Sequence, residues 1–199
     1  MEDISRIAIL ASGSGTNAEN IIKYFADRPA VEVALVAANK KDAFVLTRAA
    51  NLHIPRFWFS RQDLENGDLA KKLSEEAIDY VVLAGFLLKI PDNLLQAFPD
   101  RIINIHPALL PSYGGKGMYG SQVHEAVIKN RDSCSGISIH LVNENYDEGR
   151  MLFQAMCAVE ENDTAESLAK KVHELEYRYF PSIIEDYIRE QQGQVTKNS

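Results

Sequence analysis

Apolar residues along the chain fall into short runs, and the segments between them mix apolar and polar residues. Runs with little internal alternation are typical of strands covered on both faces, and four of them occupy residues 7–10, 31–38, 80–83 and 102–106. Helices are expected between them, at about 18–24, 42–51 and 63–77 and after Pro91, with a short strand at 57–59. This rhythm predicts an α/β fold with an open, mostly parallel twisted sheet and helices on both faces.

The second half of the chain follows a different pattern. Residues 112–120 contain four glycines and are expected to form a mobile surface loop. After this loop we expect a helix at 122–130 and a C-terminal antiparallel hairpin with strands at 136–142 and 151–159. A long terminal helix is expected to follow the hairpin. Asp163 and Thr164 are expected to cap the last helix, and Pro181 to break or bend it. The polar residues 191–199 are expected to fray.

Composition narrows the class of protein. The chain has 199 residues, 46% hydrophobic and 25% charged, which fits a single domain with a substantial core. A net charge of −7 argues against nucleic acid as a partner, although free amides at helix ends still bind anions. Neither a membrane span nor a secretory leader is evident, so a cytoplasmic protein is expected. Cys134 and Cys157 lack metal-type spacing and are expected to be buried, reduced thiols.

A glycine-containing loop, residues 12–17, joins the first strand to the first helix. In an open α/β sheet this position faces the ligand crevice. The loop is not a dinucleotide-binding G-x-G-x-x-G, because Ala18 takes the third glycine position, and it lacks the G-K-[ST] of a P-loop. Phosphate binding at the helix start and a tight turn with Asn17 as the helix cap both remain open.

The strongest chemical signal is residues 104–111, Asn-Ile-His-Pro-Ala-Leu-Leu-Pro, at the end of an apolar run. Alternate strand residues share a face, so Asn104 and His106 are expected to project together. A hydrogen-bond donor beside a titratable base at a strand end indicates a chemical site. Asp147, before Gly149, is a third candidate, although aspartate is also common in solvated turns.

Other polar residues have both structural and functional interpretations, and for Glu176 the residues alone favour the structural one. His140 and Ser138 share a face of one expected strand, where a structural hydrogen bond is as plausible as catalysis. In the terminal helix His173, Glu176 and Tyr177 lie within about one turn and can share a face.

Four motifs, taken in order, resemble the glycinamide ribonucleotide transformylases, a family of folate-dependent formyltransferases. They are residues 12–17, 82–86 and 104–111, and residues 136–140 followed by Asp147-Glu148-Gly149. The resemblance extends from about Arg6 to Tyr187 and implies a Rossmann-like formyltransferase fold. It also implies one formyltransferase domain over 1–199, with a phosphate-binding half at 1–103, a catalytic half at 104–190 and the frayed tail.

The resemblance implies transfer of a formyl group from 10-formyltetrahydrofolate to the amino group of glycinamide ribonucleotide, in de novo purine biosynthesis. The implied catalytic set is Asn104, His106 and Asp147. The implied substrate contacts are Gly15, Thr16 and Asn17 for phosphate, Glu176 for the glycinamide end, and Arg61, Leu87, Leu88, Lys89, Ile90 and Asn104 for folate. The implied partners are these small molecules, without nucleic acid or membrane, and the protein is expected to be a monomer or homodimer.

These residue types suit the implied chemistry. The amine attacks the formyl carbon, and Asn104 and a protonated His106 would donate hydrogen bonds to the developing oxyanion, each donor being worth roughly 3–4 kcal/mol. Asp147 is expected to raise the pKa of His106, and protons to pass through both residues and a bound water. No nucleophilic Ser or Cys is needed, so we expect no covalent intermediate and no metal.

The chain departs from the family pattern around the implied folate site. The family often has arginine where this chain has Leu88, beside Lys89. The loop after Pro111 has Lys116 and Tyr119 where the family has histidine.

Three alternatives remain. A formyltetrahydrofolate deformylase would use the same set but normally has an N-terminal regulatory domain, and this chain starts at the first strand. A methionyl-tRNA formyltransferase would add a C-terminal domain, and this acidic chain ends soon after Asp147. A non-catalytic folate- or nucleotide-binding homologue is disfavoured because Asn104, His106 and Asp147 are all present.

Overall fold

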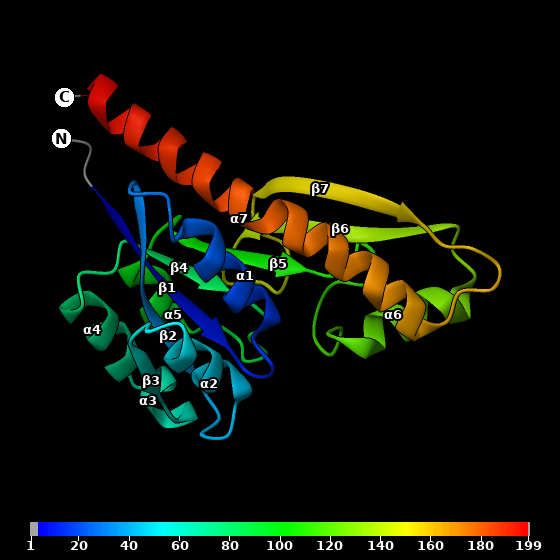
Figure 1. The fold of residues 1–199 in the computed structure, drawn as a ribbon, viewed down its shortest axis with the longest axis horizontal. Helices are drawn as coiled ribbons and strands as arrows, with labels where there is room; N and C mark the ends of the chain where they lie inside the picture. Colours follow the sequence, from blue (N-terminus) through cyan, green and yellow to red (C-terminus); the bar gives the residue numbers. More distant parts are fainter. Residues whose placement is uncertain (1–3, 199) are drawn as a thin grey trace.

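A computed structural model describes residues 4–198, which form a seven-stranded sheet with helices on both faces (Figure 1). The strands are β1 (Ser5–Ala11), β2 (Val31–Ala38), β3 (Arg56–Trp58), β4 (Tyr80–Leu83), β5 (Ile102–His106), β6 (Cys134–Leu141) and β7 (Met151–Ala158). The helices are α1 (Thr16–Phe25), α2 (Phe44–Asn51), α3 (Arg61–Glu65), α4 (Asp68–Glu75), α5 (Asp92–Ala97), α6 (Ser121–Asn130) and α7 (Ala165–Asn198). The predicted α/β class is confirmed.

Alternate residues of β1 pack on opposite faces of the sheet. Ile7 and Ile9 belong to one core, which residues of α1, α2, α6 and α7 cover. Ala8 and Leu10 belong to a second core, covered by α3, α4 and α5. All four side chains are fully buried, which explains why this strand shows no alternation in sequence.

The strand order, β3-β2-β1-β4-β5-β6-β7, contains a switch point. β1 pairs in parallel with β2 on one side and with β4 on the other. The loops that follow β1 and β4 therefore diverge at the carboxyl ends of neighbouring strands, where open α/β sheets bind ligands. Beyond β5 the sheet becomes antiparallel, because β6 pairs antiparallel with both β5 and β7. The predicted C-terminal hairpin is thus confirmed.

The single helix predicted over 63–77 is wrong, because two helices, α3 and α4, occupy this segment. Gly67 between them adopts φ 91°, a left-handed conformation that interrupts a helix. At the start of α3, Ser60 is the N-cap, and it exchanges side-chain-to-backbone hydrogen bonds with Asp63. Asp63 therefore lies inside the first turn and does not begin the helix.

The long helix α7 continues through Pro181, so a break there is wrong, and a bend stays a prediction. Proline has no N–H for the carbonyl four residues earlier, which here belongs to Tyr177. The side chain of Asn20, in α1, donates to that carbonyl at 2.9 Å. A neighbouring helix thus satisfies the group that the proline leaves without an intrahelical partner.

The ends of α7 differ in how far they match the prediction. Thr164 and Ser167 form reciprocal capping hydrogen bonds, which confirms a cap at Thr164. The helix continues to Asn198. Fraying of residues 191–199 stays a prediction, and Ser199 lies outside the described residues.

Cys134 and Cys157 are free thiols, as predicted, but they are only partly buried. Within residues 4–198, none of the helices combines the length and the apolar composition needed to cross a bilayer.

Candidate active site

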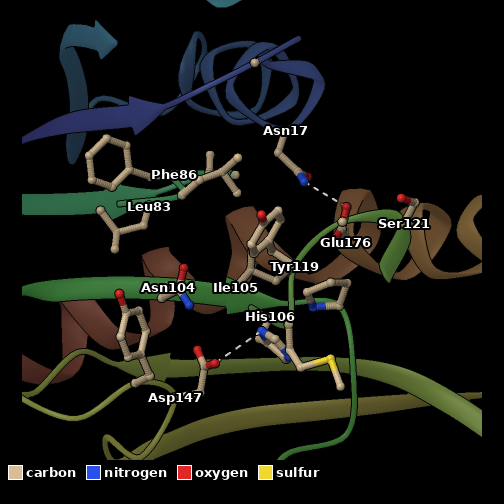
Figure 2. A pocket seen from close by; sticks show the side chains of 18 of the residues that line it. Asn17, Leu83, Phe86, Asn104, Ile105, His106, Tyr119, Ser121, Asp147 and Glu176 are labelled. Atoms are coloured by element: carbon tan, nitrogen blue, oxygen red, sulfur yellow. Dashed lines mark hydrogen bonds and ion pairs between the residues drawn. The ribbon is translucent and has the colours of Figure 1, made fainter. Parts of the chain in front are cut away.

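A pocket of about 920 Å³ opens at the carboxyl ends of β1, β4 and β5. Its walls come from residues 13–17, 83–90, 104–107 and 115–121, the loop between β6 and β7, and parts of α6 and α7. Figure 2 shows side chains from these separate elements converging on one space. This volume is in the range that accommodates a small organic ligand.

The pairing of β5 with β6 sets polar residues of the pocket opposite one another. Asn104 lies opposite His140, and His106 lies opposite Ser138. The isoleucines that alternate with them in β5 point into the core under α7, so Asn104 and His106 share the other face, as predicted.

Asp147 reaches this pair from the loop between β6 and β7. It adopts a left-handed backbone conformation with φ 58°. Its Oδ2 lies 3.7 Å from Nδ1 of His106, and its Oδ1 lies 3.6 Å from Nε2 of His140. The backbone amide of Gly115 donates to Oδ2 at 2.8 Å. The predicted set of Asn104, His106 and Asp147 is therefore together in space (Figure 2).

Backbone carbonyls define the tautomers of the two histidines when they are neutral. Nε2 of His106 lies 2.7 Å from the carbonyl of Tyr113, and Nδ1 of His140 lies 2.7 Å from the carbonyl of Leu141. A carbonyl only accepts, so each of these nitrogens carries the proton. Nδ1 of His106 is then unprotonated, and Nε2 of His140 accepts from Asn104 Nδ2 at 3.1 Å.

The pKa of His106 differs in direction from the sequence expectation. Burial lowers it below that of a free imidazole, and the Asp147 charge and the Tyr113 carbonyl raise it only in part. Asp147 raises the pKa of His106 as predicted, but the net shift is downward, because the prediction did not include the desolvation of a side chain that is 4% exposed. Burial also opposes ionisation of Asp147, but the hydrogen bond from the Gly115 amide and the contacts with His140 and His106 outweigh it and lower its pKa. The pair is thus set as a neutral imidazole beside a carboxylate.

Ser138 fixes the loop that follows His106. Its buried hydroxyl donates to the Ala108 carbonyl at 2.7 Å and accepts from the Leu110 amide at 2.9 Å. The side chain of Gln154, in β7, also donates to it at 2.8 Å. These hydrogen bonds favour the structural interpretation of Ser138 over the catalytic one.

The glycine loop presents the start of α1 to the pocket. Gly15 is the N-cap, with φ 75° and no side-chain cap, so the alternative with Asn17 as helix cap is wrong. The carbonyl of Gly13 accepts from the Val45 amide at 3.1 Å, and that of Ser14 from Arg48 Nε at 2.9 Å. Both carbonyls are thus bound to α2, and the amide end of α1 remains available to an anion.

Asn17 and Glu176 join the first and last helices inside the pocket. Asn17 Nδ2 donates to Glu176 Oε2 at 2.8 Å (Figure 2). His173 Nδ1 lies 2.7 Å from the same oxygen, and the hydrogen bond to Glu176 raises the pKa of His173. Glu176 is only 5% exposed, so this carboxylate belongs to the pocket and not to a surface pair.

The residues expected to bind folate lie in different places. Leu87, Leu88, Lys89 and Ile90 all line the pocket. Arg61 is not among the lining residues; it lies exposed at the start of α3 and pairs with Glu65 at 2.7 Å. The role of these residues in folate binding stays a prediction.

The glycine-rich loop contributes directly to the pocket. Tyr119 projects into it (Figure 2), and Lys116 lies exposed at its rim. Gly115, Gly117 and Gly120 all have positive φ, which explains the glycine content. The expected mobility of the loop stays a prediction.

Three residues of the site carry no recognisable signal in sequence. Tyr113 binds His106 through its backbone carbonyl, and Arg48 holds the glycine loop from α2. His124, in α6, lines the pocket and is 3% exposed, and its Nδ1 has no hydrogen-bond partner in the described part of the chain. Each depends on a long-range contact, which spacing along the chain does not reveal.

The donor set of the pocket is suited to organic ligands. In the described residues, no three His, Cys, Asp or Glu side chains are grouped so that they could hold a metal ion. The pocket instead combines an amide, imidazoles, carboxylates and free backbone amides.

Comparison with known proteins places this architecture in a family. Residues 5–184 match the family model described as formyl transferase. This chain belongs to the formyl transferase family. The chain is 41% identical over 186 residues to the chloroplastic phosphoribosylglycinamide formyltransferase of Arabidopsis thaliana, and the match covers 90% of this chain. It is 34% identical over 191 residues to that of Bacillus subtilis, covering 93% of this chain.

A solved structure has the same fold. The phosphoribosylglycinamide formyltransferase of Bacillus halodurans superimposes on this chain with a TM-score of 0.84 at 35% identity, covering 92% of this chain and 95% of that one. The chain spans 64% of the length of the Arabidopsis relative and 95% of the Bacillus subtilis relative.

Proposed function

We propose that the protein transfers a formyl group from 10-formyltetrahydrofolate to the amino group of glycinamide ribonucleotide, in de novo purine biosynthesis. The observation that carries the proposal is that one pocket contains both the side chains proposed for catalysis and a helix start available to an anion. One part holds Asn104, His106 and Asp147, and another holds the uncapped start of α1. An acceptor with a phosphate at one end and an amine at the other fits such a pocket.

The substrate would be held by groups at several points of the pocket. Its phosphate would bind at Gly15, Thr16 and Asn17, where amides and the helix dipole favour an anion. The glycinamide end would contact Glu176. The hydrogen bonds that this carboxylate makes with Asn17 and His173 both end on Oε2, so Oε1 would face the ligand. The folate would lie against residues 87–90.

The reaction would begin with attack of the neutral amine on the formyl carbon, forming the new C–N bond. The unprotonated Nδ1 of His106 would accept the proton that the amine loses, and the Asp147 carboxylate would stabilise the resulting imidazolium. Asn104 Nδ2 has a second N–H beyond the one directed to His140, and it would donate to the developing oxyanion. Collapse would break the bond to the folate nitrogen, and His106 would return its proton there, giving tetrahydrofolate and the formylated amide.

The test is an assay of purified protein with 10-formyltetrahydrofolate, with and without glycinamide ribonucleotide, following tetrahydrofolate and the formylated product. Release that requires the ribonucleotide is the expected result. Release without it would indicate a deformylase and overturn the proposal, and absence of release would also overturn it.

A variant separates catalysis from binding. His106→Ala should abolish transfer while leaving the dissociation constant of the ribonucleotide within a fewfold of wild type. Transfer that survives in this variant would contradict the role of His106.

A further inference from the structure

Residues 113–115 contact both partners of the His106–Asp147 pair. The carbonyl of Tyr113 accepts from His106 Nε2 at 2.7 Å. Two residues later, the amide of Gly115 donates to Asp147 Oδ2 at 2.8 Å. The intervening Gly114 is closely packed, since a Cβ placed on it would lie 2.7 Å from Leu110 Cδ2. Residues 113–115 thus hold His106 and Asp147 relative to one another.

The Tyr113 side chain anchors residues 113–115 to the end of α6. Its hydroxyl donates to Asp132 Oδ2 and accepts from Asn130 Nδ2 at 2.8 Å. Burial and the Asp132 carboxylate raise the pKa of Tyr113, which keeps the phenol protonated as a donor. Tyr113 has φ 56°, a left-handed backbone conformation that is unfavourable for a residue with a Cβ. The hydroxyl contacts offset this cost and hold the carbonyl in place.

Two acceptors compete for the one proton of the neutral His106 ring. The Tyr113 carbonyl favours a proton on Nε2, whereas the Asp147 carboxylate, 3.7 Å from Nδ1, favours a proton on Nδ1. The two outcomes differ chemically, because a ring protonated on Nδ1 would not accept a proton on the side of Asp147. The position of one carbonyl oxygen therefore decides which nitrogen is free.

We propose that Tyr113 is a positioning residue, whose anchored hydroxyl keeps its carbonyl on His106 and so holds the ring in the Nε2–H tautomer. This inference rests on the proposed function only for its effect on turnover, because the tautomer is a property of the ligand-free protein. Asp132 and Asn130 contribute to the same positioning, as the acceptor from and the donor to the Tyr113 hydroxyl.

The test uses protein labelled with ¹⁵N-histidine and two-bond ¹H–¹⁵N correlation spectra, which distinguish the tautomers. The signals of His106 are assigned by their loss in His106→Gln. Wild type should show the Nε2–H pattern. Tyr113→Phe, which removes only the hydroxyl, should shift His106 toward Nδ1–H and lower kcat roughly three- to tenfold, the effect of one lost hydrogen bond. KM for both substrates should change less than twofold.

Matched variants make the test specific. Tyr24→Phe removes another phenol-to-carboxylate hydrogen bond, to Glu185 at 2.6 Å, between α1 and α7; it should alter neither the tautomer nor kcat. Asp132→Asn retains an acceptor for the Tyr113 hydroxyl and should preserve the Nε2–H pattern. Asp132→Ala removes the acceptor and should have the same effect as Tyr113→Phe. If Tyr113→Phe does not fold, Asp132→Ala takes its place in the test.

An unchanged His106 tautomer in folded Tyr113→Phe or Asp132→Ala would overturn the inference. The spectra require no substrate, so they decide it even where the formyl transfer assay fails.

Discussion

The side chain of Asn104 has two N–H groups, and its surroundings give each a separate use. One is directed to Nε2 of His140, whose own Nδ1–H is bound to a backbone carbonyl. This chain of contacts fixes the orientation of the amide, so the second N–H is available to substrate. Preorganised donors of this kind need no rearrangement when charge develops on the formyl oxygen.

Asn104→Ala is therefore expected to lower kcat by about 10²–10³-fold, the usual effect of removing one oxyanion donor. Steady-state kinetics with both substrates measures this. Asn93→Ala is the control, because that amide binds the Glu65 carbonyl at 2.9 Å, away from the pocket. A loss smaller than tenfold in Asn104→Ala would show that this amide does not bind the developing charge.

At the scale of single elements, strands were more predictable than helices. The run 80–83 matches β4 because four consecutive buried residues leave few other interpretations. The segment 63–77 was misread because Asn66-Gly67 can end one helix and begin another, and only the packing of α3 and α4 selects that outcome. The continuation of α7 through Pro181 was not predicted because the compensating partner, Asn20, lies in a distant element.

The junction between the glycine loop and α2 leads to a prediction about Gly15. A Cβ there would lie 2.8 Å from the Cα of Val45, and φ is 75°. Gly15→Ala should lower the free energy of unfolding by about 2 kcal/mol or more, since left-handed strain alone costs about 1–2 kcal/mol. Gly13→Ala is the matched control, because nothing lies within 4 Å of its added Cβ. Equal losses in denaturant unfolding of the two variants would contradict the steric explanation.

The contact between Asn20 and α7 leads to a double-mutant cycle. Asn20→Ala should lower the free energy of unfolding by about 1 kcal/mol, because the Tyr177 carbonyl loses its donor. In a Pro181→Ala background the new amide can donate to that carbonyl, so the same change should cost close to nothing. Denaturant titration of the four proteins gives the coupling. Additive losses would mean that Asn20 does not act through the carbonyl.

At the scale of the whole molecule, the sequence predicted where the chemistry lies better than how it is tuned. The position of Asn104 and His106 at a strand end follows from their spacing and from the parallel sheet. The direction of the pKa shift of His106 depends on burial by loops distant in sequence. The contacts of Tyr113, Arg48 and His124 depend on the same assembly and were not predicted.

Buried histidines should make the stability of the whole fold sensitive to pH. Burial lowers the pKa of both His106 and His124, while in the unfolded chain both titrate near 6.5. As the pH falls below about 6.5, the unfolded state binds protons that the folded state does not, so stability decreases. The raised pKa of His173 acts above this range, and its contribution is already complete below about 6.5. Each buried group contributes at most about 1.4 kcal/mol per pH unit.

Denaturant unfolding between pH 5 and 7 measures this slope. His124→Gln should reduce it, and the combination with His106→Gln should reduce it further. A slope that stays the same in the double variant would assign the pH dependence to other groups.

The position of α7 has a practical consequence for protein engineering. Its last turns return to the amino end of β1, where the Gln192 side chain donates to Ser5 Oγ at 3.1 Å (Figure 1). The pocket opens at the opposite, carboxyl end of β1. A fused domain attached after α7 would therefore extend away from the ligand entrance. The contact between Gln192 and Ser5 makes the fold a candidate for circular permutation, with residues near these two joined by a linker and new termini at the exposed junction between α3 and α4.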